Sequence, residues 1–246
     1  MTGSRPEAAD ASAEELVHRA AGGDLAAFAR IVRLHNEEMT RVAFVITGDL
    51  DSAVRATEAA WPLAWDGLGR RRPPDALGPW LCSLVATEAV MVAMCDSADG
   101  TAGPAGRPDE RAEAGLALDV VMDRLDPGDR ALLALRHIAG LSLDELARAK
   151  RRSRSSVAAR LERATAAVAG PQPLGTDPGV VEREVAYRLL AYAGVRVRPV
   201  DADAVARRAR TGEQFDGTRV VSVAISLVAG ALVAGLPYLA MLFHRR

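Results

Sequence analysis

The chain contains few residues of several types, and each shortage excludes some kinds of fold or site. It has only two cysteines, Cys82 and Cys95, and its four histidines show no metal-ligand spacing, so we expect neither a disulfide framework nor a metal site. Aromatic residues make up 4% of the 246 residues, and no run of alternating Val, Ile and Thr predicts a sheet. Much of the 49% hydrophobic content is Ala, a strong helix former, so the composition predicts an all-α fold.

The sequence also lacks the patterns that common catalytic sites need. It contains no recognisable Ser–His–Asp set, Cys–His pair, metal-ligand cluster or glycine-rich phosphate loop, so we expect no catalytic residues and no cofactor. Carboxylates such as Asp24, Asp144 and Glu145 have a simpler interpretation as helix caps and solvated side chains. The N-terminus is polar and acidic, which does not resemble a signal peptide.

Charge is unevenly distributed, and residues 125–168 form a basic stretch in a chain whose net charge is −1. Nine Arg or Lys against five Asp or Glu leave this stretch at +4. Three short helical patterns follow one another within it. Asp126 caps the first, Ser142 and Glu145 form a capping box on the second, and Ser153 caps the third. This is the layout of a helix-turn-helix DNA reader, although an ordinary helical bundle with a charged corner has the same pattern.

Residues 220–243 form the longest uncharged run. From Val220 to Phe243 the run has 24 residues, about 36 Å as a helix, which is enough to cross a hydrocarbon core of about 30 Å. We therefore expect a transmembrane helix rather than a buried core helix. More Arg residues flank its N-terminal side, which predicts that this side faces the cytoplasm. A stripe of small residues at every fourth position could pair with another helix in the membrane.

Changes in composition predict the domain organisation. Helical patterns begin near Ser12, which with Glu15 forms a second capping box, and Pro62 is expected to kink or break a later helix. In order, we expect an N-terminus without regular structure (1–11), a four-helix domain (12–96), a linker (97–110), the helix-turn-helix domain (111–169), a linker with two juxtamembrane helices (170–218), a transmembrane helix (219–243) and a short tail (244–246).

Several short motifs follow one another across residues 12–168. They are Glu15-Leu16-Val17, Gly23-Asp24, Ala27-Phe28, Gly48-Asp49, Trp61 with Ala64-Trp65, Trp80-Leu81, and then Leu125, Pro127, Arg130, Leu133, Leu135, Arg136, Gly140-Leu141-Ser142, Glu145, Ala147, Ser153, Val157, Arg160-Leu161 and Arg163-Ala164. On these residues the chain resembles a bacterial RNA polymerase sigma factor of the extracytoplasmic-function group. The likeness is more specific in the second domain than in the first.

The resemblance implies a role for each domain. The first domain would bind core RNA polymerase and melt the −10 promoter element, through polymerase-binding residues Asp49, Asp51, Glu58, Trp61 and Trp65. The second would read the −35 element of double-stranded promoter DNA through Lys150, Arg151, Arg152, Arg154, Ser155, Ser156 and Arg160. Arg can bind phosphate or pair bidentately with guanine, and a helix N-terminus attracts phosphate. The uncharged run and its flanking Arg residues predict a single-pass location in the inner membrane, with the N-terminal domains in the cytoplasm, where an anti-sigma or other membrane partner could regulate the protein.

Some positions depart from the family pattern. Ser52-Ala53-Val54-Arg55 replaces an acidic cluster, and Ala59 replaces a Glu. The helix expected to hold the −10 strand carries no positive charge on its matching face, which consists of Ser83, Ala86, Thr87, Met91 and Val92. Arg151 stands where a left-handed backbone is expected. Three hypotheses follow: a membrane-tethered sigma factor, a sigma-derived DNA-binding regulator without polymerase activity, and a membrane interaction module without DNA contact.

Overall fold

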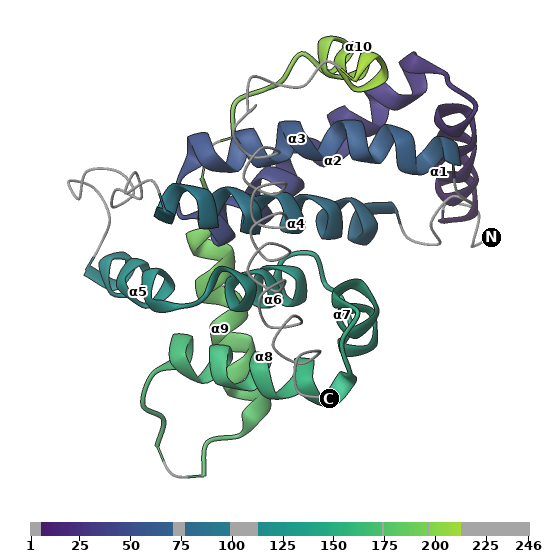
Figure 1. The fold of residues 1–246 in the computed structure, drawn as a ribbon. Coiled ribbons are helices and arrows are strands. Elements are labelled where there is room, and N and C mark those ends of the chain that lie inside the picture. Colours follow the sequence, from purple (N-terminus) through teal and green to yellow (C-terminus); the bar gives the residue numbers. More distant parts are fainter. Residues whose placement is uncertain (1–5, 71–76, 99–112, 174, 196, 213–246) are drawn as a thin grey trace, which may run out of the picture. The chain divides into compact units, whose positions relative to one another are not determined.

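The computed structural model describes residues 6–70, 77–98, 113–173, 175–195 and 197–212, which contain ten α-helices and no strand (Figure 1). The predicted all-α fold is confirmed. The helices are α1 Pro6–Ala21, α2 Leu25–Thr47, α3 Leu50–Arg70, α4 Leu77–Ala98, α5 Glu113–Arg124, α6 Pro127–His137, α7 Leu143–Lys150, α8 Arg154–Ala169, α9 Pro178–Tyr192 and α10 Ala202–Thr211. The predicted transmembrane helix at 219–243, the tail and most of the predicted linker at 97–110 lie outside the described residues.

The predicted start of the first helix is wrong. Helix α1 begins at Pro6 instead of near Ser12, so Ser12 lies inside the helix. Proline fits the first turn of a helix, and the Ala- and Glu-rich residues that follow favour helix, so nothing forces a later start. At Pro62 the sequence predicted a kink or a break, and α3 runs through this residue as one helix, so the break does not occur. The neighbouring Trp61 and Ala64 are fully buried, and this packing offsets the hydrogen bond that proline removes.

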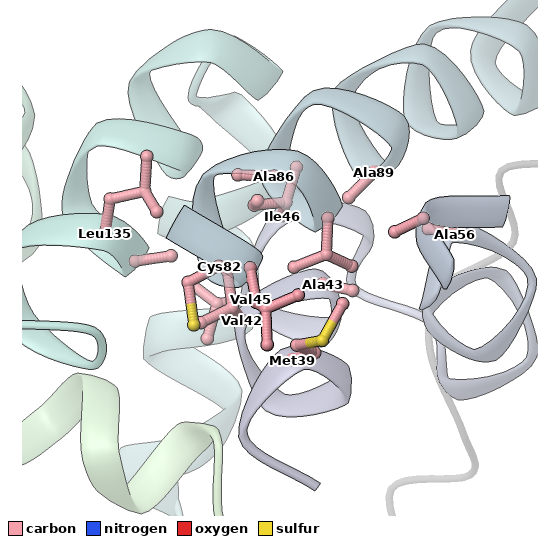
Figure 2. Packing of buried hydrophobic residues seen from close by; sticks show 14 of the residues in the cluster. Met39, Val42, Ala43, Val45, Ile46, Ala56, Cys82, Ala86, Ala89 and Leu135 are labelled. Carbon is pink, nitrogen blue, oxygen red and sulfur yellow. The ribbon is translucent and has the colours of Figure 1, made fainter. Parts of the chain in front are cut away.

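Helices α2, α3 and α4 pack against one another, and α6 packs on α2 and α4 (Figure 1). Figure 2 shows the result: Ile46 of α2, Ala56 of α3, Cys82 of α4 and Leu135 of α6 belong to one cluster of buried side chains. Both predicted domains therefore contribute to the same core. Burial raises the pKa of the Cys82 thiol well above its ordinary value, so it is an inert core residue.

Helix α4 is the one described helix that is long and apolar enough to cross a membrane. It is instead a core helix of the described part of the chain, because Leu81, Cys82, Val85, Ala86 and Ala89 are all buried. Its contacts with α2, α3 and α6 account for its apolar composition.

The last two described helices pack on the rest of the chain. Helix α9 contacts α5, α6 and α8, and α10 contacts α2 and α3. Both helices have an Asp N-cap: Asp177 accepts a hydrogen bond from the backbone N–H of Gly179, and Asp201 accepts from those of Asp203 and Ala204. The two helices that the sequence predicted as juxtamembrane therefore pack against the other described helices.

Candidate nucleic-acid interface

The first helix of the candidate DNA reader, α7, begins with the predicted capping box. Glu145 donates its backbone N–H to Ser142 Oγ at 3.3 Å, and Glu145 Oε2 accepts the backbone N–H of Ser142 at 2.7 Å. Hydrogen bonds from the Ser142 hydroxyl and then from its backbone hold the pKa of Glu145 below its ordinary value. These bonds fix where α7 starts, and with it the turn that leads to α8.

The turn between α7 and α8 ends in a left-handed residue, as the sequence predicted. Arg151 has φ 49° and ψ 43° and is the non-glycine residue with positive φ among those described. The backbone N–H of Arg152 donates to the carbonyl of Ala147, and that of Arg151 donates to Arg148. This is a Schellman motif with Arg in the position that glycine usually takes. The strained residue is held in place by these two bonds.

Helix α8 presents its N-terminus to solvent. Ser153 Oγ accepts the backbone N–H of Ser156 at 3.3 Å, so Ser153 is the N-cap that the sequence predicted. The predicted DNA-binding residues Arg152, Arg154, Ser155 and Ser156 are all exposed, and the first buried side chain of the helix is Val157. Exposed Arg and Ser side chains beside free N–H groups form a surface suited to phosphate and base edges.

Two of the predicted DNA-binding arginines already have carboxylate partners, and the two pairs differ. Arg154 lies 3.2 Å from Asp144, and both side chains are more than 60% exposed, so water and salt screen this pair strongly. Arg160 is half-buried and contacts Asp129 at 2.7 Å and Asp126 at 3.3 Å. These contacts attach α8 to the start of α6. Arg154 is therefore available to exchange its partner for a phosphate, whereas Arg160 has a structural role in this conformation.

The basic field around the turn comes from four more residues. Arg148, Arg151 and Arg152 are exposed and form no ion pair within the described part of the chain. Lys150 is half-buried; burial, and then Arg160, lower its pKa. Arg148 was not among the DNA-binding residues predicted from the sequence. Its position in the last turn of α7, three residues before Arg151, could have indicated that it lies near the turn.

The predicted polymerase-binding residues occupy different environments. Asp49 accepts the backbone N–H of Ser52 and so caps α3, and Asp51 is exposed in its first turn. Trp61 is fully buried and donates its indole N–H to Asn36 Oδ1 at 3.1 Å, so in this structure it is a core residue without an exposed surface. Trp65 is half-buried, with its ring centroid 5.1 Å from that of Phe28.

Glu58, the remaining predicted polymerase-binding residue, is half-buried. Burial raises its pKa, and the positive charge of Arg208 on α10 partly opposes this. The proximity of Arg208 to Glu58 could not be predicted from the sequence, because the two residues are far apart in the chain.

The departures from the family pattern have a structural counterpart. Where an acidic cluster was expected, Arg55 forms an ion pair with Asp96 at 2.9 Å, and Ser52 donates its hydroxyl to the same carboxylate at 2.8 Å. This joins the start of α3 to the end of α4. On the face expected to hold the −10 strand, Ala86 and Val92 are buried. That face of α4 is therefore divided between the core and the surface, because Ser83 and Met91 are half-buried and Thr87 is exposed.

Comparison with known proteins agrees with the geometry of the helix-turn-helix half. Residues 115–168 match the family model described as sigma-70, region 4. A protein named "Probable RNA polymerase sigma factor RfaY", from Xanthomonas campestris pv. campestris, is 28% identical over 170 residues, covering 63% of this chain and 42% of that relative. The matched part is less than half of the relative's length. No solved structure matches the chain. Residues 115–168 are therefore similar to region 4 of sigma-70 factors, and both comparisons support a sigma factor.

Proposed function

We propose that the chain is a membrane-tethered sigma factor of the extracytoplasmic-function type, which recruits core RNA polymerase to promoters by binding the −35 element. The observation that carries the proposal is the exposed, basic N-terminus of α8, set behind a Schellman turn within residues 115–168 that match sigma-70 region 4. Region 4 of such factors binds the −35 promoter element. In this proposal Arg152, Arg154, Ser155 and Ser156 contact DNA directly.

Lys150, Arg148 and Arg151 supply affinity that does not depend on sequence, through the phosphate backbone. Arg160 keeps α8 in position through Asp129 and Asp126. Of the five predicted polymerase-binding residues, Trp61 is fully buried, whereas Asp49, Asp51, Glu58 and Trp65 keep some exposed surface and are the candidates for contact with polymerase.

The membrane tether rests on the sequence. The uncharged run from Val220 to Phe243 is long enough to span a bilayer, and Arg residues are concentrated before it. If it is a span, the full chain stays in the membrane fraction after extraction at high pH, and a chain with Gly230→Arg and Ala234→Arg moves to the soluble fraction. Release of the unmodified chain by high pH contradicts the tether.

The polymerase pull-down separates this function from its nearest alternative. Full-length chain, immobilised in detergent, is offered core RNA polymerase. We expect retention of polymerase, and we expect Arg154→Ala to retain as much polymerase while binding less DNA, because Arg154 lies on the DNA-facing helix.

A DNA-binding regulator without polymerase activity is the second candidate. The Arg55–Asp96 pair on α3 and the burial of Ala86 and Val92 on α4 favour it, because they alter surfaces that polymerase and the −10 strand would use. Duplex binding without polymerase retention supports this candidate, and loss of both activities leaves a membrane interaction module.

A further inference from the structure

The segment 178–211 contacts both halves of the described fold, which are the first half (α1–α4) and the helix-turn-helix half (α5–α8). At its start, Val185 and Leu189 of α9 are buried against the helix-turn-helix half. Glu182 on α9 forms an ion pair with Arg136 of α6 at 2.7 Å, and Arg188 donates to the carbonyl of Val168 in α8 at 3.3 Å. Helix α9 is therefore fixed to the helix-turn-helix half through apolar and charged contacts.

The end of the same segment is attached to the first half. The ring of Tyr192, the last residue of α9, lies with its centroid 5.3 Å from that of Phe44 on α2. Helix α10 then packs on α2 and α3 with Val205, Ala206 and Ala209 buried. Asp203 forms an ion pair with Arg33 of α2 at 3.4 Å, and Arg208 is close enough to Glu58 to affect its charge.

The buried face of α10 consists of small side chains. They are Ala202, Val205, Ala206 and Ala209, each of which removes little apolar surface from water, and the Asp203–Arg33 ion pair is more than half exposed on both sides. A helix of ten residues is not stable alone in water, so α10 depends on α2 and α3 for its structure.

We propose that α9 and α10 form a clasp in which α9 stays fixed to the helix-turn-helix half while α10 covers the α2–α3 face, so that core polymerase binds only after α10 is displaced. The polymerase part of this statement rests on the proposed function, which assigns Glu58 to the polymerase contact. Along the sequence, α10 is the last described helix before the expected membrane span.

Opening the clasp is tested in the full chain with Ala206→Glu, which places a charge in the buried face of α10. Arg207→Ala is the matched control, since it changes the net charge by the same amount on the exposed face of the same helix. Hydrogen exchange reports on the clasp without polymerase. We expect Ala206→Glu to speed exchange in α10 while the buried amides of α6 and α8 stay protected, and Arg207→Ala to change neither.

Polymerase retention is then compared between the same chains. We expect Ala206→Glu to bind polymerase about tenfold more tightly than the unmodified chain, because apparent affinity rises with the fraction of open molecules. Unchanged exchange in α10 overturns the clasp. Faster exchange with unchanged affinity overturns the masking of polymerase by α10.

The reverse test locks the clasp. Arg33→Cys and Asp203→Cys, in a Cys95→Ser background, are joined by a bis-maleimide whose spacer contains a reducible disulfide. We expect the cross-linked chain to lose polymerase binding and to regain it when the spacer is reduced. Equal binding before and after reduction contradicts the proposal. If no chain, open or locked, retains polymerase while exchange responds as expected, the proposed function fails and α10 remains a structural clasp.

Discussion

Two arginines on α8 illustrate how similar positions in a sequence can take different roles. Arg154 and Arg160 were both predicted to face DNA, and both have carboxylate partners in the structure. The Arg154–Asp144 pair is exposed on both sides, so it contributes little to stability. The Arg160–Asp129 pair is partly shielded and joins α8 to α6.

The first prediction compares these arginines. Arg154→Ala should weaken binding to a specific duplex by about 1–3 kcal/mol if it reads a base, with little change in the urea midpoint. Arg160→Ala should lower the urea midpoint more than Arg154→Ala does, because it leaves Asp126 and Asp129 near one another without their cation. Equal loss of stability in both variants would show that the exposed pair is as structural as the shielded one.

The second prediction concerns the left-handed residue Arg151. Arg151→Gly removes a strain of about 1–2 kcal/mol. The added freedom of glycine in the unfolded chain offsets about 0.4–1 kcal/mol of this gain. We therefore expect a small increase in the free energy of unfolding, measured with urea, together with weaker and less salt-dependent DNA binding. Arg151→Val is the control, since a β-branched residue with positive φ should destabilise the turn.

For individual residues, the sequence predicted the local backbone conformation better than it predicted the side-chain partners. The caps Asp126, Ser142 and Ser153 and the backbone of Arg151 follow from local rules, because each depends on neighbours within a few residues. The partners of Arg160 do not follow from these rules, since Asp126 and Asp129 lie about thirty residues away and meet it only after folding.

Close packing between α3 and α4 gives the third prediction, at the scale of whole elements. A Cβ added to Gly67 would lie 2.7 Å from the rigid indole of Trp80. Gly67→Ala should therefore destabilise the fold by about 1–3 kcal/mol through overpacking, despite the higher helix propensity of Ala. Gly78→Ala is the matched control, because its added Cβ meets His35 at an ordinary 3.6 Å. Thermal unfolding distinguishes them, and a lower melting temperature for Gly78→Ala alone contradicts this account.

The helices themselves show where sequence patterns suffice. The Pro127, Ser142 and Ser153 signals placed α6, α7 and α8 closely, because each is a start signal next to a clear apolar face. The start of α1 was predicted wrongly, because the local signal at Ser12 was given more weight than the helix-forming residues before it. At Pro62 the sequence left a kink or a break open, and the buried neighbours of this residue keep α3 in one piece.

Three helix-capping carboxylates give the whole molecule a pH dependence. Hydrogen bonds to backbone N–H groups or to Ser142 hold the pKa values of Asp24, Glu145 and Asp201 below their ordinary values of 3.8, 4.5 and 3.8. A depressed folded-state pKa stabilises the fold above the unfolded value, and this contribution is lost as pH falls through the folded value.

The fourth prediction is therefore that the fold weakens as pH falls below about 4, where these groups protonate. Asp24→Asn keeps the capping oxygen and removes the titrating group, so we expect a smaller loss of stability per pH unit in acid. Unfolding in urea at several pH values measures this. An unchanged acid dependence in Asp24→Asn would show that Asp24 does not contribute.

Tertiary placement is the part that the sequence could not predict. The spacing of Ala and Val along α10 predicts that one face of this helix is buried. It does not predict that α2 and α3 are the helices that bury it. The shared core of α2, α4 and α6 could not be predicted either. Leu135, Cys82 and Ile46 are apolar residues whose sequence positions do not indicate that they belong to one cluster (Figure 2). Charge is better predicted, since the +4 stretch at 125–168 remains mostly exposed around the turn.

The central claim, that the basic end of α8 directs polymerase to DNA, is tested most directly by transcription from selected templates. Random-sequence duplexes bound by the full chain are recovered, and the enriched templates are transcribed with core polymerase and either the unmodified chain or Arg154→Ala. The account predicts transcripts that begin at one fixed distance downstream of the enriched motif, and their loss with Arg154→Ala. An enriched motif without transcripts contradicts the claim, and so do transcripts whose start points do not depend on the motif.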